Sequence, residues 1–209
     1  RPNIQDALGY LQITEEGRSW IAGLNYHVFS QSHKASIEKS GVSLITKLAD
    51  LNLELIQTEK FIEIILESVC DYSGWPIGHA YEVVNKKDDI RLSSTKVWFT
   101  TIIDDDLEQF IKISEDYEFK VGEGLPGRVY KYGSVQTIYD VTKDNNFPRA
   151  KLATDIDVRG AFAFPIKNEE EILYIFEFFS FEPEQISPPV IELMRQLSVQ
   201  ISRKFQGND

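Results

Sequence analysis

The stretch from Phe119 to Ile166 limits the possible folds most strongly, because it sets several local signals in one fixed order. A Gly-rich turn at residues 122–129 is followed by a short helix, a strand and an Asp-Val turn at Asp140-Val141. A helix start with Phe-Pro-Arg-Ala at 147–150 then precedes a buried strand that ends in Phe-Pro-Ile at 164–166. Glycine permits positive φ angles and close backbone approach. The order predicts a lid that crosses one face of a sheet.

Composition excludes several classes of protein. The 209 residues suit one domain plus an appendage, and 42% of them are hydrophobic, so a core can form. The net charge of −11 argues against a nucleic-acid or anionic-membrane partner. No apolar run approaches the roughly 20 residues that span a bilayer, so we expect no membrane insertion. Cys70 is the only cysteine, which excludes an intrachain disulfide.

The domain organisation is expected to be an extension over residues 1–36, of unknown role, and a main domain over 37–209. Residues 20–29 are too apolar for a disordered tail. The chain starts at Arg1 without a secretory pattern. We therefore expect a cytoplasmic fragment of a longer protein, with an output domain elsewhere.

A long helix is predicted over residues 37–72. Steps of alternately four and three residues give a coiled-coil-like seam, of which eight of ten members are apolar. The seam predicts a homodimer through helices 37–72 and 188–205. The alternative is a single long helix that lies on its own sheet. The seam consists of Ile37, Gly41, Leu44, Leu48, Leu51, Leu55, Thr58, Ile62, Ile65 and Val69.

The remaining pattern predicts an α+β fold. Gly74 and Pro76 end the first helix, and Ser187-Pro188 opens the last one. Acidic residues at 104–106 are placed to cap a short helix. Alternating apolar residues predict strands at 79–84, 97–103, 135–139, 160–166 and 171–180. We expect a central antiparallel sheet with the terminal helices on one face and short helices or loops over the other.

Seven short motifs in this order resemble a GAF domain, a PAS-related sensing module of bacterial sensor histidine kinases and diguanylate cyclases. The resemblance covers about residues 45–205 and implies a ligand pocket between the sheet and the lid. It also implies a regulatory domain of a two-component or similar signalling protein, without catalytic residues. The motifs are Gly74-Trp75, residues 78–81, 122–129, Asp140-Val141, 146–150, 164–166 and 177–180.

Seven residues are candidates for the pocket lining, because small-molecule pockets are mostly apolar with a few convergent polar groups. The guanidinium of Arg149, in the first turn of a short helix, could hold a carboxylate or phosphate. The alternatives are that Arg149 pairs with Asp140 or Asp144, and that the aromatic residues are simply core. The candidates are Tyr81, Trp98, Phe147, Arg149, Phe162, Phe164 and Phe176.

Other site chemistries are disfavoured by the residues present. The segment 122–128 lacks the Lys-Ser/Thr pair of a P-loop, so a structural turn is favoured over a phosphate cradle. Cys70 lies among apolar residues, which favours a buried structural thiol. His27, His33 and His79 show no i, i+4 spacing, so no metal or haem site is predicted.

The resemblance also bears on the known chemistries of GAF-like proteins. Bilin-binding relatives use a Cys beside a His, and methionine sulfoxide reductases of this fold need several cysteines. The cyclic-nucleotide signature would follow the last strand, where this chain has Phe178-Phe179-Ser180. We therefore expect no cofactor and no enzymatic activity. The expected function is to sense an unknown small molecule and pass the signal through the terminal helices, and the alternative is a ligand-free domain that serves as a dimerisation or protein-interaction spacer.

Overall fold

The computed structural model describes residues 41, 44–46, 48, 56–86, 89–101, 105–169 and 171–205. They belong to one compact unit, Gly41–Asp209. The predicted extension over 1–36 and the first residues of the predicted long helix lie outside the described residues. None of the described helices is long and apolar enough to cross a membrane.

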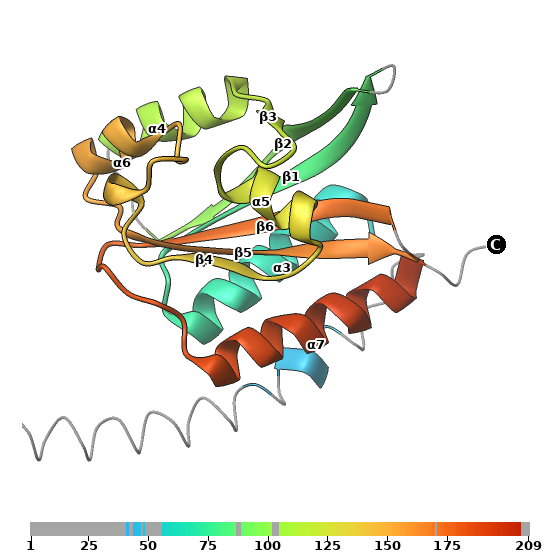
Figure 1. Ribbon diagram of the computed structural model, residues 1–209. Coiled ribbons are helices and arrows are strands. Elements are labelled where there is room, and N and C mark those ends of the chain that lie inside the picture. The colour runs from blue at the N-terminus through green and yellow to red at the C-terminus, as the bar shows by residue number, and fades with distance from the viewer. Residues whose placement is uncertain are drawn as a thin grey trace, which may run out of the picture. The chain divides into compact units, whose positions relative to one another are not determined.

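One antiparallel sheet forms the centre of this unit (Figure 1). Its strand order is β3-β2-β1-β6-β5-β4, so the first strand of the chain lies beside the last. Strands β1 and β6 are therefore the central pair, and the predicted antiparallel sheet is confirmed. The strands are β1 (Ile77–Lys86), β2 (Asp89–Thr100), β3 (Phe119–Lys120), β4 (Gln136–Ile138), β5 (Gly160–Asn168) and β6 (Glu171–Ser180).

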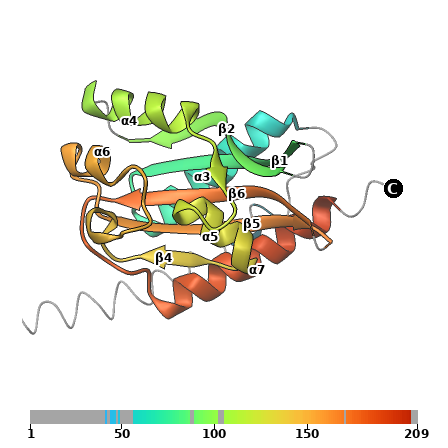
Figure 2. The same ribbon diagram turned by 45° about the horizontal axis from the view of Figure 1, so that its top comes forward.

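The helices form a layer on each face of the sheet. Helices α3 (Thr58–Ser73) and α7 (Pro188–Phe205) lie on one face. The other face carries α4 (Asp105–Asp116), α5 (Gly124–Tyr132) and α6 (Ala150–Asp155), as Figure 2 shows from a second direction. A 3-10 turn, η3 (Val141–Lys143), lies between β4 and α6. This is the predicted arrangement of terminal helices below and short helices above.

Strand alternation divides the core into two layers. On β6, Ile175 and Phe179 join the cluster beneath the lid, together with Leu125 of α5. The intervening Phe176 and Phe178 stack on Phe164 of β5 instead, on the side of α3 and α7. Successive side chains of a strand point to opposite faces, so neighbouring residues of β6 serve different layers.

The long helix predicted over 37–72 is interrupted, which is a correction. Gln57 is extended, with φ −61° and ψ 145°, and α3 begins only at Thr58. An apolar heptad pattern continues through such a break because the pattern records burial and not helix continuity. Gly74, with a φ of 75°, ends α3 as predicted, and its N–H donates to the carbonyl of Cys70.

The seam residues within α3 are buried inside the protomer. Ile62, Ile65 and Val69 are 2%, 0% and 0% exposed. On α7, the apolar face with Met194 and Leu197 is also buried against the sheet side of the molecule. Within one protomer, these seam residues of α3 are therefore covered by the protein's own core, and the predicted homodimer stays a prediction.

Strand β2 is longer than predicted, starting at Asp89 and not at 97, and the short β3 was not predicted. Polar residues at 93–95 hide the alternation of β2, and Lys96, with a φ of 61°, marks an irregularity in it. The pairing register with β1 shifts between His79 and Tyr81. Residues 95–97 therefore bulge out of the pairing with β1, opposite Ala80.

The Gly-rich turn requires glycine at position 127 because there is no space for a Cβ atom there. A Cβ at Gly127 would lie 2.3 Å from the carbonyl oxygen of Lys120. Replacing Gly127 by alanine is therefore expected to lower the free energy of unfolding by about 3 kcal/mol, measured by urea denaturation. As a control, Gly74→Ala adds a Cβ that meets nothing within 4 Å and should cost only about 1 kcal/mol for its positive φ. Equal losses in the two variants would contradict the steric argument.

Candidate ligand site beneath the glycine-rich lid

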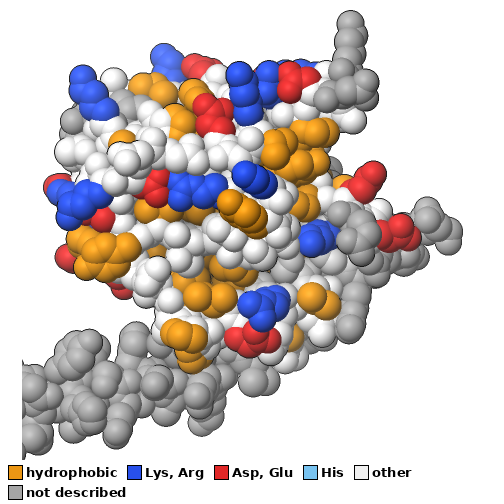
Figure 3. Space-filling view, viewed as in Figure 1, with side chains coloured by type: hydrophobic (Ala, Val, Ile, Leu, Met, Phe, Trp, Pro, Cys, Tyr) orange, Lys and Arg blue, Asp and Glu red, His pale blue; other side chains and the backbone are white. Residues whose placement is uncertain are grey.

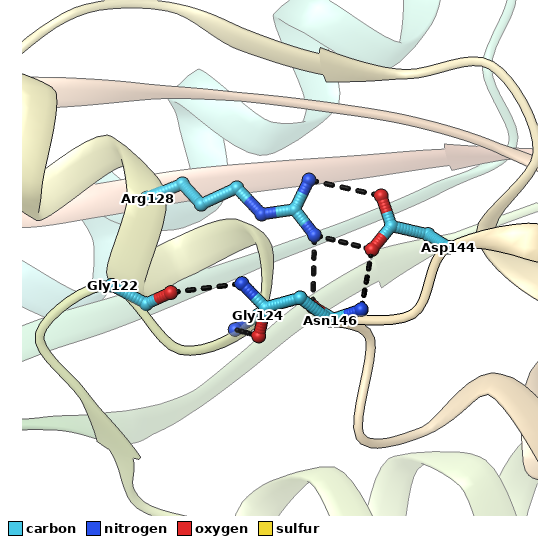
Figure 4. A network of polar contacts seen from close by, with 5 residues as sticks. All are labelled: Gly122, Gly124, Arg128, Asp144 and Asn146. Carbon is cyan, nitrogen blue, oxygen red and sulfur yellow. Dashed lines mark hydrogen bonds and ion pairs between the residues drawn. The ribbon is translucent and has the colours of Figure 1, made fainter.

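A largely part-buried polar network ties two segments of the lid together, and we call it the latch (Figure 4). Arg128 of α5 forms a two-pronged ion pair with Asp144, in which Nη1 donates to Oδ2 over 2.9 Å. The amide of Asn146 donates to the carbonyl of Gly122 over 2.9 Å and accepts from the N–H of Gly124 over 3.1 Å. The latch therefore joins the Gly-rich turn to the segment 144–146.

The latch bears on whether the Gly-rich turn is a phosphate cradle or a structural turn. The N–H of Gly124 donates to Asn146, and the N–H of Gly122 donates to the carbonyl of Gly127 over 2.8 Å. These two donors are used within the lid and do not point to an open anion site. The predicted structural turn is confirmed.

The side chain of Arg149, three residues after Asn146, enters the interior. Its side chain is 2% exposed, and Nη2 donates to both carboxylate oxygens of Glu177 at 2.9 Å. Nη1 donates to Ser114 of α4 over 3.0 Å. Glu177 lies on the central strand β6 and is fully buried. The lid is thus fastened to the middle of the sheet by an ion pair.

Aromatic rings enclose this guanidinium. Its central carbon lies 5.0–5.5 Å from the centroids of four phenylalanine rings, which is within the range of a cation–π interaction. The rings come from four parts of the chain, namely α4, β3, the lid and β6. They belong to Phe110, Phe119, Phe147 and Phe179.

These contacts correct the alternative in which Arg149 pairs with Asp140 or Asp144. Asp144 pairs with Arg128 in the latch, and Asp140 pairs with Lys143 over 3.0 Å and caps η3. Arg149 pairs with neither of them. An acid distant in sequence is its partner, because the segment after the latch turns inward to the sheet.

Strand β1 adds two polar side chains beside the ion pair. The hydroxyl of Tyr81 donates to Glu177 over 3.2 Å. His79 is stacked on Trp98 at 3.9 Å between ring centroids, and its Nε2 lies 2.8 Å from the hydroxyl of Ser94. Strands β1 and β6 therefore supply the polar partners of the guanidinium, while aromatic rings come from the sheet, α4 and the lid alike.

Burial controls the protonation of these groups. Burial, and then the charge of Arg149, lowers the pKa of His79 well below its usual value, so this ring is neutral. Burial also raises the pKa of Tyr81. Burial lowers the pKa of Arg149, but Glu177 and Tyr81 more than offset this effect and hold it above its usual value. The guanidinium therefore stays charged.

Two buried nitrogen atoms stand out in this interior. The Nδ1 of His79 and the Nε of Arg149 have no hydrogen-bond partner among the described residues. An unsatisfied buried polar atom costs about 1–3 kcal/mol. Such atoms are rare in native proteins, and a bound water, ion or ligand can satisfy them.

The structure separates the seven predicted site residues into two groups. Tyr81, Trp98, Phe147 and Arg149 gather beneath the lid around the ion pair. The other three lie on the opposite face of the sheet, where the ring of Phe162 contacts that of Trp75 and the ring of Phe164 stacks on that of Phe176. The seven residues therefore do not line one common space, because β5 and β6 alternate between the two layers.

Sequence reasoning missed Glu177 and the rings of Phe110, Phe119 and Phe179. An acid inside the apolar run of β6 was the available signal for Glu177. Cys70 lies near Gly78, on the side of α3, and burial raises the pKa of its thiol. Among the residues that the structure describes, no cluster of His, Cys, Asp and Glu could hold a metal ion.

The chain belongs to the GAF domain family, whose model matches residues 57–206. No curated protein matches this chain. Among solved structures, it is similar to the free methionine-R-sulfoxide reductase of Neisseria meningitidis in complex with its substrate. The identity is 13% and the TM-score 0.60, over 82% of this chain and 89% of that one.

Two non-reductase GAF structures are similar to the same degree. The GAF domain of Acinetobacter phosphoenolpyruvate-protein phosphotransferase has 11% identity and a TM-score of 0.58, covering 81% of this chain and 92% of that one. The nlh2 GAF domain of A. aeolicus in an inactive state has 17% identity and a TM-score of 0.56, covering 83% and 99%. At these identities the likeness shows the fold alone.

The ion pair can be tested by a double-mutant cycle. We expect Arg149→Met to lower the free energy of unfolding by about 3–5 kcal/mol, because it leaves the carboxylate of Glu177 buried and unpaired. Glu177→Met should cost a similar amount. The double variant should regain most of the loss, since a well-packed apolar pair replaces the ions. Urea denaturation measures all three, and purely additive losses would contradict the pairing.

Proposed function

We propose that this chain is the regulatory, small-molecule-sensing domain of a cytoplasmic signalling protein. The ligand would bind between the sheet and the lid, at the four candidates Tyr81, Trp98, Phe147 and Arg149. A kinase or cyclase output domain, as in two-component systems, would lie elsewhere in the full protein. The fold and family support a regulatory role, and the interior described above supports a sensing one.

The buried ion pair is the observation that carries this proposal. Desolvation makes a buried pair no more stabilising than apolar residues of the same volume in many proteins. A domain that served only as a spacer could fill its interior with apolar residues such as leucine and phenylalanine. Ionisable groups with strongly shifted pKa values, such as His79 and Tyr81, occur preferentially at functional sites.

The proposed route of the signal runs through strand β6. Glu177 contacts Arg149 on the lid side, while its neighbours Phe176 and Phe178 pack on the opposite side of the sheet. A ligand that alters the Arg149–Glu177 contact would shift β6 and, through it, the layer of α3 and α7. The helices would carry that shift to the output domain.

A reductase activity is not proposed for this chain. The similar reductases show that the fold can host an enzyme, and GAF-type reductases need several cysteines. Cys70 is the only cysteine and lies on the α3 side of the sheet, away from the ion pair.

The second candidate function is a ligand-free spacer that joins other domains or protein partners. The observation that favours it is the filled interior, in which Arg149 is 2% and Phe147 4% exposed. In that case the ion pair would simply fix the lid.

A screen of metabolites by thermal unfolding separates the two functions. A ligand of the interior should raise the melting temperature of the wild-type domain and leave that of Arg149→Met/Glu177→Met unchanged, because this matched variant keeps the packing and removes the charges. Equal shifts in both proteins would place binding elsewhere. A complete lack of shifts in the wild type would favour the spacer.

The homodimer remains a proposal, with its contact moved to the outward side of α7. There Val199 is 47% exposed, whereas the inward residues are already covered. Figure 3 shows basic, acidic and apolar side chains interspersed on the face that it draws. Light scattering that gave the mass of a monomer at high concentration would rule the dimer out, and Val199→Glu should dissociate it.

A further inference from the structure

We propose that the interior beneath the lid is a recognition site for an organic cation, and that Arg149 is its built-in occupant. The cation would carry a guanidinium or alkylammonium group. This inference rests on the proposed sensing function and names the class of ligand.

The groups around Arg149 are those that recognise an organic cation. A fully buried carboxylate, Glu177, accepts two hydrogen bonds from the guanidinium, and four aromatic rings surround it. Cation–π attraction is strongest when the cation is desolvated. We call Glu177 and the rings of Phe110, Phe119, Phe147 and Phe179 the cage. Aromatic faces offer no ligand atoms to a small metal ion, so the cage fits an organic cation.

Most of the cage is fixed, while its present occupant belongs to the lid. Glu177 and Phe179 lie on the central strand β6, and Phe110 lies on α4. Arg149 instead follows the latch residues Asp144 and Asn146 on one short segment. If that segment lifts, Arg149 leaves together with Phe147, and the carboxylate stays behind with three rings.

A free cation would replace a contact that the protein already makes with itself. The tethered guanidinium has the advantage of proximity, so the ligand must gain additional contacts. The unpartnered Nδ1 of His79 offers one, since this ring lies 4.4 Å from that of Tyr81, which in turn bonds to Glu177. The net charge of −11 also attracts cations to the domain.

The latch would then set the apparent affinity. A ligand that binds only the open lid has an apparent Kd raised by the rarity of that state. Asn146 joins the two sides of the latch through its amide. Asn146→Ala should therefore populate the open lid and increase the apparent affinity for the cation, while the cage itself remains unchanged.

The test removes the occupant and supplies it again from solution. The variant Arg149→Ala is titrated with methylguanidinium, and melting is followed by circular dichroism. We expect a saturable rise of about 3–6 °C at a tenfold excess over the Kd. Methylurea is the neutral control of the same shape, and sodium chloride controls for ionic strength. In the matched variant Arg149→Ala/Glu177→Gln, methylguanidinium should produce no shift.

A second variant covers the case in which Arg149→Ala does not fold. Asn146→Ala keeps the ion pair, and methylguanidinium should raise its melting temperature at lower concentration than it does for the wild type. The inference is overturned if methylurea acts as well as methylguanidinium, or if neither Arg149→Ala nor Asn146→Ala responds to the cation.

The outcomes also separate this inference from the proposed function. A neutral or anionic metabolite that stabilises the wild type, without any guanidinium response in Arg149→Ala, would overturn the cation site and leave sensing intact. A guanidinium response in Arg149→Ala, combined with wild-type and Asn146→Ala proteins that bind no metabolite or cation at all, would support the chemistry of the cage and count against sensing.

Discussion

The ion pair between Arg149 and Glu177 determines how the lid packs on the sheet. Both charges are removed from water, so leaving either one without its partner would be costly. The position of the lid segment is therefore tied to the central strand β6. The four rings around the guanidinium pack against a charged group, and their arrangement depends on that group staying in place.

The lid is held by two contacts of different character. The latch pair, Arg128 and Asp144, is 20% and 19% exposed, whereas Arg149 and Glu177 are 2% and 0% exposed. The interior pair with Arg149 is buried and strongly coupled to its surroundings. Opening of the lid would require both contacts to break, and a ligand that replaced the inner contact would favour the open state. That is the behaviour required of a ligand-controlled switch.

Strand β6 connects the ion pair to both layers of the domain. Glu177 and Phe179 face the lid, while Phe176 and Phe178 face the helical layer. A displacement of one residue along a strand exchanges the faces completely. Under the proposed function, changes around Glu177 would therefore not be absorbed by sliding and would act on the packing next to α3 and α7.

The sequence by itself determined most of the elements and their layers, because apolar periodicity, Gly74, the Gly-rich turn and Ser187-Pro188 are local signals. It missed β3 and the start of β2. It also indicated Tyr81, Trp98, Phe147 and Arg149. It did not determine that Phe162, Phe164 and Phe176 face the other layer, nor the break at Gln57.

Only the tertiary structure decided the partner of Arg149. The pairing with Glu177 joins a loop to a strand 28 residues away, and no local pattern encodes such a contact. It depends on the strand order that places β6 at the centre of the sheet, beneath the lid. The physical reason is that local signals fix backbone conformation, whereas burial and charge pairing depend on which distant segments meet.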